Sequence, residues 1–316
     1  MFVRLLIAAP AALVAAIATL AGGSEISALT SGDRIMGGRL LHENGEVRVY
    51  AAPVPPWTRG FDLAAVSAEG APDQGGVAYL LDDRQATVAG PEPALFRRIA
   101  GEALNQRGVN DLSVFSLQVA NDFQRIYVHE ADIIRAGEVL DRIDDLVVSA
   151  GAAPEIDSQT QQLSEVRSIV MRVPGVRPGD RVRVSYSLAG GHPLVDHGQA
   201  AFAEPVGAAF AHVRRTIRAP QGAEAAGIGQ FAEAVRTTAD GVTEHVFLDG
   251  AAGPPPGFTD APAWRVGDWA MVSTTPDWMT VSRWGAELFE PVRSQAVEAA
   301  AAEIAAAHAD PGAQIA

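Results

Sequence analysis

Arginine is the residue type in this sequence best suited to bind another molecule. All 24 basic residues are Arg, and Arg172, Arg177, Arg181 and Arg183 lie close together. Residues 181–188 alternate polar and apolar side chains, so Arg181 and Arg183 are expected on one face of a β-strand. Because guanidinium groups pair well with carboxylates and phosphates, these four arginines predict a ligand-binding face. The alternative is a solvated outer face balanced by neighbouring acids.

Composition excludes several other kinds of chemistry. The 316 residues contain no Cys, which excludes a thiolate zinc site and a Cys nucleophile. They contain no Lys, which excludes a phosphate-binding P-loop and Schiff-base chemistry. A formal net charge of −14 argues against a nucleic-acid partner, which requires a basic surface. We therefore predict no catalytic residue, no metal and no cofactor for this chain.

Two short motifs have a functional and a simpler interpretation. His192, Asp196 and His197 are possible metal ligands, but two His five positions apart in an extended chain point to opposite faces. A polar loop is the favoured interpretation. Residues 227–232 (GIGQFA) match the dinucleotide-binding pattern G-x-G-x-x-A, but no buried parallel strand is predicted before them, so a loop is again favoured.

Neighbouring acidic residues could supply the two carboxylates of a glycosidase. Acidic residues are abundant in this chain, and solvated turns are the favoured explanation for nearly all of them. The pairs in question are Asp82 with Asp83, Glu130 with Asp132, and Asp141 with Asp144 and Asp145.

The elements that must position these residues are short strands. Period-two alternation recurs between residues 53 and 250, and turns rich in Gly, Pro and Asp separate the runs. This pattern predicts a mainly β protein with an antiparallel two-sheet β-sandwich over residues 53–250. Residues 95–104 fit both a helix and a strand. The strand runs are residues 77–81, 112–119, 125–134, 166–173, 181–188, 211–218 and 242–248.

Composition changes on both sides of the predicted sandwich. Residues 24–52 are polar and Gly-rich, which predicts a flexible leader, and residues 251–276 predict a Pro/Gly-rich linker. Residues 277–316 predict a C-terminal α-helical extension, with Asp277 as the N-cap of its first helix and a second helix ending near His308. Asp310 and Pro311 resemble the start of a further helix, so we expect a domain that is truncated at residue 316.

The first 23 residues have the pattern of a secretory signal. Arg4 precedes an apolar run over residues 5–21, and Ala21 and Gly23 fit the small residues of a cleavage site. An uncleaved membrane anchor is the alternative, although 17 residues that include Pro10 are short for a membrane span. We expect an exported, periplasmic or cell-envelope protein with no membrane span after signal removal.

Four segments occur in a recognisable order. Residues 76–85 (GVAYLLDDRQ) form an opening strand, residues 135–141 (RAGEVLD) a hairpin, residues 173–184 a Pro-Gly-Asp turn that begins a strand, and residues 273–289 a linking helix. In this order they resemble the N-terminal domain of unknown function that precedes a transglutaminase-like core in exported bacterial proteins. The resemblance covers roughly residues 53–316. It implies a β-sandwich followed by a core with a Cys-His-Asp constellation, none of which can be assigned to residues of this chain.

Two hypotheses of function follow. The first is a non-catalytic accessory module whose partner in cis is the transglutaminase-like domain. The second is a stand-alone envelope binding protein that recognises an anionic glycan or peptide, or an envelope protein, through the arginine face. Trp side chains at the domain edges favour packing between domains over sugar binding. The predicted interface residues are Trp57, Trp278, Val281, Trp284 and Leu288.

Overall fold

The computed structural model divides the chain into two compact units, Met1–Thr275 and Pro276–Ala316. It describes residues 37–44, 47–66, 71–90, 92–120, 123–151, 166–191, 200–203, 208–252, 269–288 and 295–307. The predicted signal segment, His192 to His197 and most of the predicted linker lie outside these residues. None of the helices in the described ranges has both the length and the apolar character that a membrane span requires.

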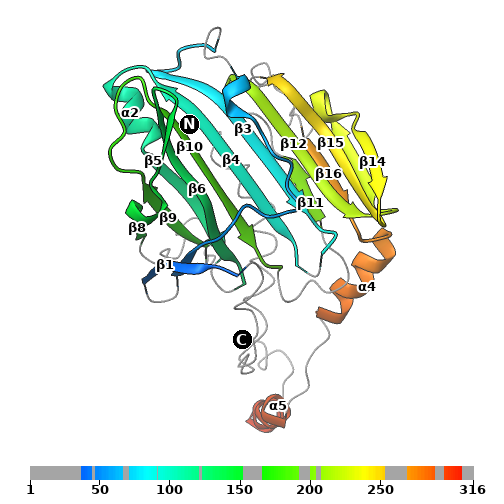
Figure 1. Ribbon diagram of the computed structural model, residues 1–316. Helices are drawn as coiled ribbons and strands as arrows, with labels where there is room; N and C mark the ends of the chain where they lie inside the picture. The colour runs from blue at the N-terminus through cyan, green and yellow to red at the C-terminus, as the bar shows by residue number, and fades with distance from the viewer. Residues whose placement is uncertain are drawn as a thin grey trace. The chain divides into compact units, whose positions relative to one another are not determined.

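A large sheet of ten strands is the main element of the first unit (Figure 1). Across the sheet, the strands are β1 (Arg39–Asn44), β2 (Val47–Ala51), β6 (Arg125–Arg135), β10 (Arg181–Ala189), β4 (Ala94–Ala103), β3 (Val77–Thr87), β12 (Phe210–Pro220), β15 (Val242–Ala252) and β14 (Val235–Ala239). The tenth strand, β7 (Glu138–Asp141), pairs with β6.

Two three-stranded sheets complete the first unit. One contains β5 (Val114–Ala120), β9 (Val166–Arg172) and β8 (Val147–Ala150), and the other contains β11 (Ala200–Ala203), β16 (Trp269–Ser273) and β13 (Glu224–Ile228). The short helix α2 (Gln106–Leu112) precedes β5. Single 3₁₀ turns lie at η1 (Leu63–Ala65), η2 (Ile143–Asp145) and η3 (Gly229–Phe231).

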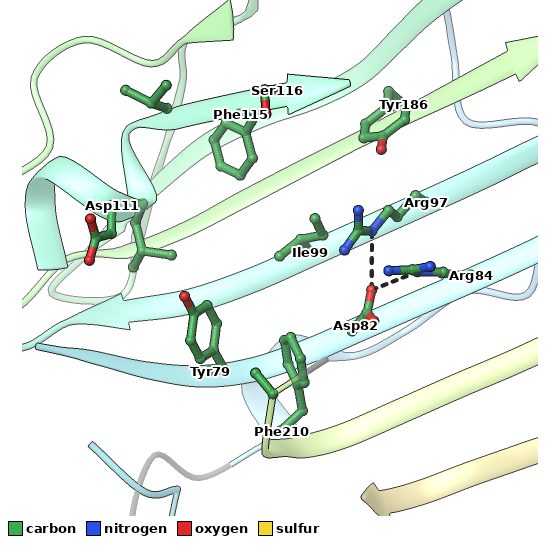
Figure 2. Close-up of a pocket in the computed structure, with 13 residues that line it drawn as sticks. Tyr79, Asp82, Arg84, Arg97, Ile99, Asp111, Phe115, Ser116, Tyr186 and Phe210 are labelled. Carbon is green, nitrogen blue, oxygen red and sulfur yellow. Dashed lines mark hydrogen bonds and ion pairs between the residues drawn. The ribbon is translucent and has the colours of Figure 1, made fainter. Parts of the chain in front are cut away.

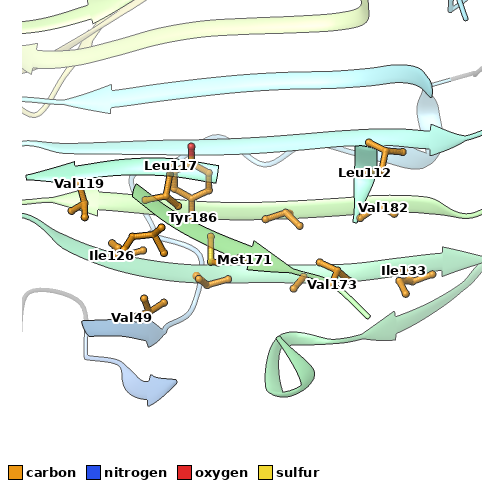
Figure 3. Packing of buried hydrophobic residues seen from close by; sticks show 14 of the residues in the cluster. Val49, Leu112, Leu117, Val119, Ile126, Ile133, Met171, Val173, Val182 and Tyr186 are labelled. Atoms are coloured by element: carbon orange, nitrogen blue, oxygen red, sulfur yellow. The ribbon is translucent and has the colours of Figure 1, made fainter. Parts of the chain in front are cut away.

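Both small sheets pack on one face of the large sheet, which we call the inner face. Residues paired directly across neighbouring strands share a face. The inner face of β10 presents Val182, Val184 and Tyr186, which join Leu117 and Met171 of the β5–β9–β8 sheet in one apolar core (Figure 3). A second core is formed with the β11–β16–β13 sheet by Ala86, Ile217, Phe231, Ala270 and Val272.

Residues 52–66 lie across the opposite, outer face of the large sheet. The Arg59 backbone N–H donates to Gln85 Oε1 at 2.7 Å, and Arg218 Nη1 donates to the Trp57 carbonyl at 2.7 Å. Leu63 packs with Leu80, Leu81 and Ala100 in a small apolar cluster. The central strands are therefore covered on both faces, and β3 is buried along almost its whole length.

The prediction of a mainly β, sandwich-like fold is confirmed, but the large sheet is not wholly antiparallel. β3 pairs with β12, and β2 pairs with β6, in parallel. Each of these pairs joins strands that are far apart in sequence, and such pairings leave no local turn signal. Residues 95–104, which were ambiguous, form the strand β4 and one residue beyond it.

Two of the predicted domain boundaries are wrong. Residues 39–51, expected in the flexible leader, form β1 and β2, and Val47 and Val49 are buried in the first core. Residues 269–273, expected in the linker, form β16, the central strand of its small sheet. Their alternation covers only five residues each, which is too short to stand out beside flanking Gly and Pro.

The Pro-Gly-Asp turn before β10 has the structure that the sequence predicts. Gly175 and Gly179 have φ of +85° and +87°, values that a glycine adopts without strain. Asp180 is buried and accepts hydrogen bonds from Arg135 Nε at 2.8 Å and from the Arg177 backbone N–H at 2.7 Å. This turn fixes the residue at which β10 begins, and so fixes which of its side chains face inward.

In its described residues, 276–288 and 295–307, the second unit contains two helices, α4 (Trp278–Leu288) and α5 (Gln295–Ala307). Asp277 caps α4 as predicted, because its Oδ1 accepts from the Thr280 backbone N–H at 2.8 Å. The second predicted helix is confirmed within the described residues, with its start at Gln295.

Candidate binding site

The structure does not bring the four predicted arginines onto one surface. Arg181 and Arg183 lie on the outer face of β10, Arg172 lies in β9 of a small sheet, and Arg177 lies in the turn before β10. Arg181 Nε donates to Glu102 at 3.1 Å and Arg183 Nε donates to Asp132 at 2.9 Å. The prediction of a single arginine face is therefore wrong, because the strand order separates these residues and acids on neighbouring strands neutralise two of them.

Ion pairs on the outer face are structural. Arg98 Nε donates to Glu130 Oε2 at 2.7 Å, and Arg183 lies 3.4 Å from the other oxygen of Glu130. Arg214 lies 3.6 Å from the buried Asp83. These groups hold neighbouring strands together beneath residues 52–66. The acids Asp83, Glu130 and Asp132 are thus not in solvated turns, as expected, but in the sheet.

A partly open pocket of about 300 Å³ lies over the inner face of the large sheet (Figure 2). Strands β3, β4 and β10 form its floor, and α2, the start of β5 and the start of β12 form its walls. The side chains that line it fall into a charged group and an apolar group. They are Tyr79, Asp82, Arg84, Arg97, Ile99, Asp111, Leu112, Val114, Phe115, Ser116, Tyr186, Ala208 and Phe210.

The charged group arises from a row of directly paired residues across four strands. Tyr186 on β10 pairs with Arg97 on β4, Arg97 pairs with Arg84 on β3, and Arg84 pairs with Arg215 on β12. Directly opposed like charges destabilise a sheet. Three guanidinium groups in one row therefore place three positive charges close together on the inner face.

The carboxylate of Asp82 faces this row of arginines. Its Oδ1 lies 3.4 Å from Arg84 Nε and 3.2 Å from Arg97 Nε, and its Oδ2 accepts from Arg215 Nη2 at 2.5 Å. Burial opposes its charge, but Arg97, Arg84 and Arg215 together hold the pKa of Asp82 well below its usual range. Asp82 is therefore ionised at neutral pH and cannot serve as a general acid.

The arginines also affect one another. Burial and the nearby Arg97 lower the pKa of Arg84 to about 10, although Asp82 acts in the opposite direction. Arg84 is thus held in a site where a further positive charge is disfavoured. An anion in the pocket would relieve this repulsion.

The rest of the lining is apolar and aromatic. Phe210 packs against Tyr79 with 5.0 Å between ring centroids, and Ile99 lies on the floor between the arginines and these rings (Figure 2). Hydroxyl groups of Tyr79 and Tyr186 add hydrogen-bond donors. The pocket is therefore two-sided, with a cationic side and an apolar side.

One pair of residues elsewhere has the geometry of a nucleophile and its base. Ser187 Oγ lies 2.8 Å from His129 Nε2, and His129 Nδ1 lies 3.0 Å from the Ala52 carbonyl. Ser187 is completely buried, and Phe96 stacks on the His129 ring at 5.8 Å. Burial also lowers the pKa of His129. A substrate cannot reach this pair, so its role is structural.

The remaining predicted motifs carry no chemistry within the described residues. No three His, Asp or Glu side chains there are close enough to hold a metal. The glycine motif at residues 227–232 is not simply a loop, since it spans the end of β13 and the turn η3. A Cβ on Gly227 would lie 2.0 Å from the Phe231 carbonyl oxygen, so close packing explains this glycine. Asp82 and Asp83 face opposite sides of β3 and form no carboxylate pair.

The predicted interface residues belong to different units. Trp57 lies on the outer face, where its ring meets Phe96 edge-on with centroids 6.5 Å apart. Trp278 on α4 is 82% exposed, whereas Val281 and Trp284 on the same helix are half-buried. Leu288 ends α4, and its side chain lies outside the described residues.

Sequence reasoning missed the pocket residues Arg84 and Arg97 and expected Arg215 on an outward face, although a signal was present. Arg97 is followed by Arg98, and Arg214 by Arg215. Because successive residues of a strand point to opposite faces, one member of each pair must face inward. Adjacent arginines on a strand buried on both faces therefore indicate at least one buried guanidinium.

Comparison with known proteins supports the fold, but it does not identify a chemical activity. A search of curated proteins gives no match. Among solved structures, a Parabacteroides distasonis ATCC 8503 protein described as a candidate protease aligns over 63% of this chain and 40% of its own, with 14% identity and a TM-score of 0.51. At this identity the likeness shows a similar fold only.

Two further solved structures align less well. An M1 zinc metallopeptidase from Deinococcus radiodurans covers 62% of this chain and 42% of its own, with 17% identity and a TM-score of 0.32. Yeast LTA4 hydrolase in complex with bestatin covers 69% and 31%, with 9% identity and a TM-score of 0.29. This chain spans less than half the length of each of these structures. The two lower TM-scores support no inference about this chain.

One family model matches the centre of the chain, and its description is a domain of unknown function with solved structure (DUF3857). The match covers residues 95–247, from the second residue of β4 into β15. It therefore leaves out β3, which supplies Asp82 and Arg84 to the pocket. Over residues 95–247, this chain thus contains a domain that matches the DUF3857 family.

Proposed function

We propose that this chain is a non-catalytic binding module whose inner-face pocket accepts an anionic group. The observation that carries this proposal is the pair Arg97 and Arg84 beside an ionised Asp82 at the floor of the pocket, with the fully buried Arg215 behind them in the same row. Guanidinium groups stay protonated at neutral pH, so they bind anions without exchanging protons. The described pocket residues include no His that could act as a base for Ser116.

The module belongs, in this proposal, to an exported protein that also carries a transglutaminase-like core. The order of the motifs at residues 76–85, 135–141 and 173–184 supports this place, as does the signal-like pattern of residues 1–23. N-terminal sequencing of the chain from an envelope extract tests export. A start at Ser24 is expected, and a chain that retains Met1 in the cytoplasm would contradict it.

Binding and turnover by the purified chain test the function. We expect saturable binding of at least one small anion, seen as a rise in unfolding temperature over NaCl of equal ionic strength. The rise should be lost in Arg97→Gln and kept in Arg48→Gln, which removes an exposed charge on β2 far along the sheet. Peptides and esters should not be hydrolysed. Turnover, or the absence of any anion effect, would contradict the proposal.

A further inference from the structure

The two sides of the inner-face pocket limit the kind of anion that it can accept. This inference rests on the proposed binding function and narrows it to one ligand class. At one side, Arg97 and Arg84 each direct Nε towards Asp82 Oδ1. At the other side, the rings of Tyr79, Phe115 and Phe210 face the same space (Figure 2). A ligand that uses both sides must have a charged head and an apolar tail.

The head is best matched by a carboxylate. A guanidinium group presents five N–H donors in a planar fork, which fits the two oxygens of a carboxylate. Arg97 lines the pocket and its side chain is 26% exposed, so the ligand can reach it. The Tyr186 hydroxyl group, which lines the same pocket, can donate to a carboxylate as well.

The charges around the pocket favour a ligand that has a single negative charge. The ionised Asp82 already lies against the guanidinium groups, and it repels a second charge on the head of the ligand. Asp111, on α2, lines the pocket, and it repels an acidic tail. A phosphate monoester places a second charge near Asp82, and a dicarboxylate places one near Asp111, whereas a monocarboxylate with an uncharged tail has a single charge and keeps it away from Asp111.

The size of the pocket favours a small ligand. A volume of about 300 Å³ lies at the lower end of the range for small-molecule sites, roughly 300 to 1,000 Å³. We infer that the pocket binds a small monocarboxylate whose tail is an aromatic or branched aliphatic group. Such a carboxylate could belong to a free organic acid or to the C-terminus of a peptide that ends in an apolar residue.

Calorimetric titration of the full chain with matched probes tests this inference. We expect 3-phenylpropionate to bind at least tenfold more tightly than 3-phenylpropanamide, which lacks the charge, and than acetate, which lacks the tail. A tenfold loss corresponds to about 1.4 kcal/mol, less than a charge-assisted hydrogen bond typically contributes. A short peptide ending in Phe, with its C-terminus free or amidated, distinguishes the two sources of the carboxylate.

Two variants assign the binding to this pocket. Arg97→Gln should weaken 3-phenylpropionate at least tenfold, with Arg48→Gln as the control of equal charge change. Because Arg97 is partly buried, Asp111→Trp provides a second test from an exposed position on α2 that lines the pocket. It should block binding, whereas Asn110→Trp, at the exposed neighbouring position that does not line the pocket, should not.

The outcomes separate this inference from the proposed function. Phenyl phosphate or acetate binding as tightly as 3-phenylpropionate would overturn the ligand class and leave anion binding in place. Binding that survives both Arg97→Gln and Asp111→Trp would overturn the assignment to this pocket. If no anion binds the wild-type chain, the inference and the proposed function both fail.

Discussion

Two adjacent aspartates on β3 show how strongly a strand separates its two faces. Asp82 faces three arginines on the inner face, and its pKa is well below the usual range. Asp83 faces the outer side, where it is completely buried with Arg214 3.6 Å away and Gln85 donating at 3.0 Å. Burial raises the pKa of Asp83 to about 6, although Arg214, Gln85 and Arg98 act to lower it. The pKa values of these two adjacent residues are therefore shifted in opposite directions.

The Asp83→Asn variant should change how stability depends on pH. The folded chain holds the Asp83 proton up to about pH 6, whereas the unfolded chain releases it near pH 3.8. The carboxyl therefore lowers the stability of the wild type progressively as the pH rises from 4 to 7, by up to about 3 kcal/mol. Asn does not titrate, so the free energy of unfolding of the variant minus that of wild type should increase over this range.

Urea unfolding of both proteins at pH 4, 5.5 and 7 measures this difference. Asp144→Asn, at a carboxylate that is 73% exposed, reports the effect of the same substitution without burial. A difference between Asp83→Asn and wild type that stays constant with pH would show that Asp83 titrates normally in the folded chain.

At the scale of elements, the short helix α2 packs closely on the start of β3 because Gly76 and Gly108 have no side chains. The Asn105 side chain caps it by accepting from the Arg107 and Gly108 backbone N–H groups at 2.9 and 3.2 Å. A Cβ on Gly108 would lie 1.9 Å from the Gly76 carbonyl oxygen, so the helix sits directly on the start of β3. Through Leu112, α2 also forms a wall of the pocket. Its position therefore determines the shape of the site.

Gly108→Ala should destabilise the chain although it improves helix propensity. Ala is favoured over Gly in a helix interior by about 1 kcal/mol. Here the added methyl group must displace backbone, and overpacking of this kind costs about 1 to 3 kcal/mol. Urea unfolding should show a lower midpoint and anion binding should weaken. A raised midpoint would show that α2 does not approach Gly76 so closely.

Local signals explain which elements the sequence predicts correctly. The alternation of residues 181–188 and the turn at Asp180 lie within a few residues of each other, and both are confirmed. By contrast, the row from Tyr186 through Arg97 and Arg84 to Arg215 depends on the register of four strands. No local pattern specifies that register. The sequence therefore predicts strands and their faces, but not which inward-facing arginines become neighbours.

The missed elements have a different cause. α2 has only seven residues, β16 only five, and each is held in place by contacts with distant segments. Short elements depend on tertiary packing more than on their own propensity. Composition alone assigned β1, β2 and β16 to a leader and a linker, because polar and Gly-rich neighbours hid their alternation.

At the scale of the first unit, the large sheet links two separate apolar cores. Met171, 1% exposed, belongs to the core beneath the β5–β9–β8 sheet. Phe231, fully buried, belongs to the core beneath the β11–β16–β13 sheet. The strands β3, β4, β10 and β12 run between these cores without a break in pairing. The two cores should therefore unfold together.

Met171→Ala and Phe231→Ala test this cooperativity. Each should lower the stability of one common unfolding transition of the first unit, by about 2 to 5 kcal/mol for Met171 and about 3 to 5 kcal/mol for Phe231. Denaturant unfolding followed by tryptophan fluorescence and by circular dichroism measures both. Two separable transitions, each sensitive to only one of the substitutions, would show that the cores are independent.

The parallel pairing of β3 with β12 has a consequence for the synthesis of the chain. Phe210, where β12 begins, follows Thr87, where β3 ends, by 123 residues. At roughly 5 to 20 residues per second, a ribosome needs on the order of ten seconds to make that stretch. During this time one edge of β3 has unpaired backbone groups, and such edges readily associate with other chains. The nascent polypeptide therefore depends on chaperones, or on delayed collapse, until its distant partner emerges.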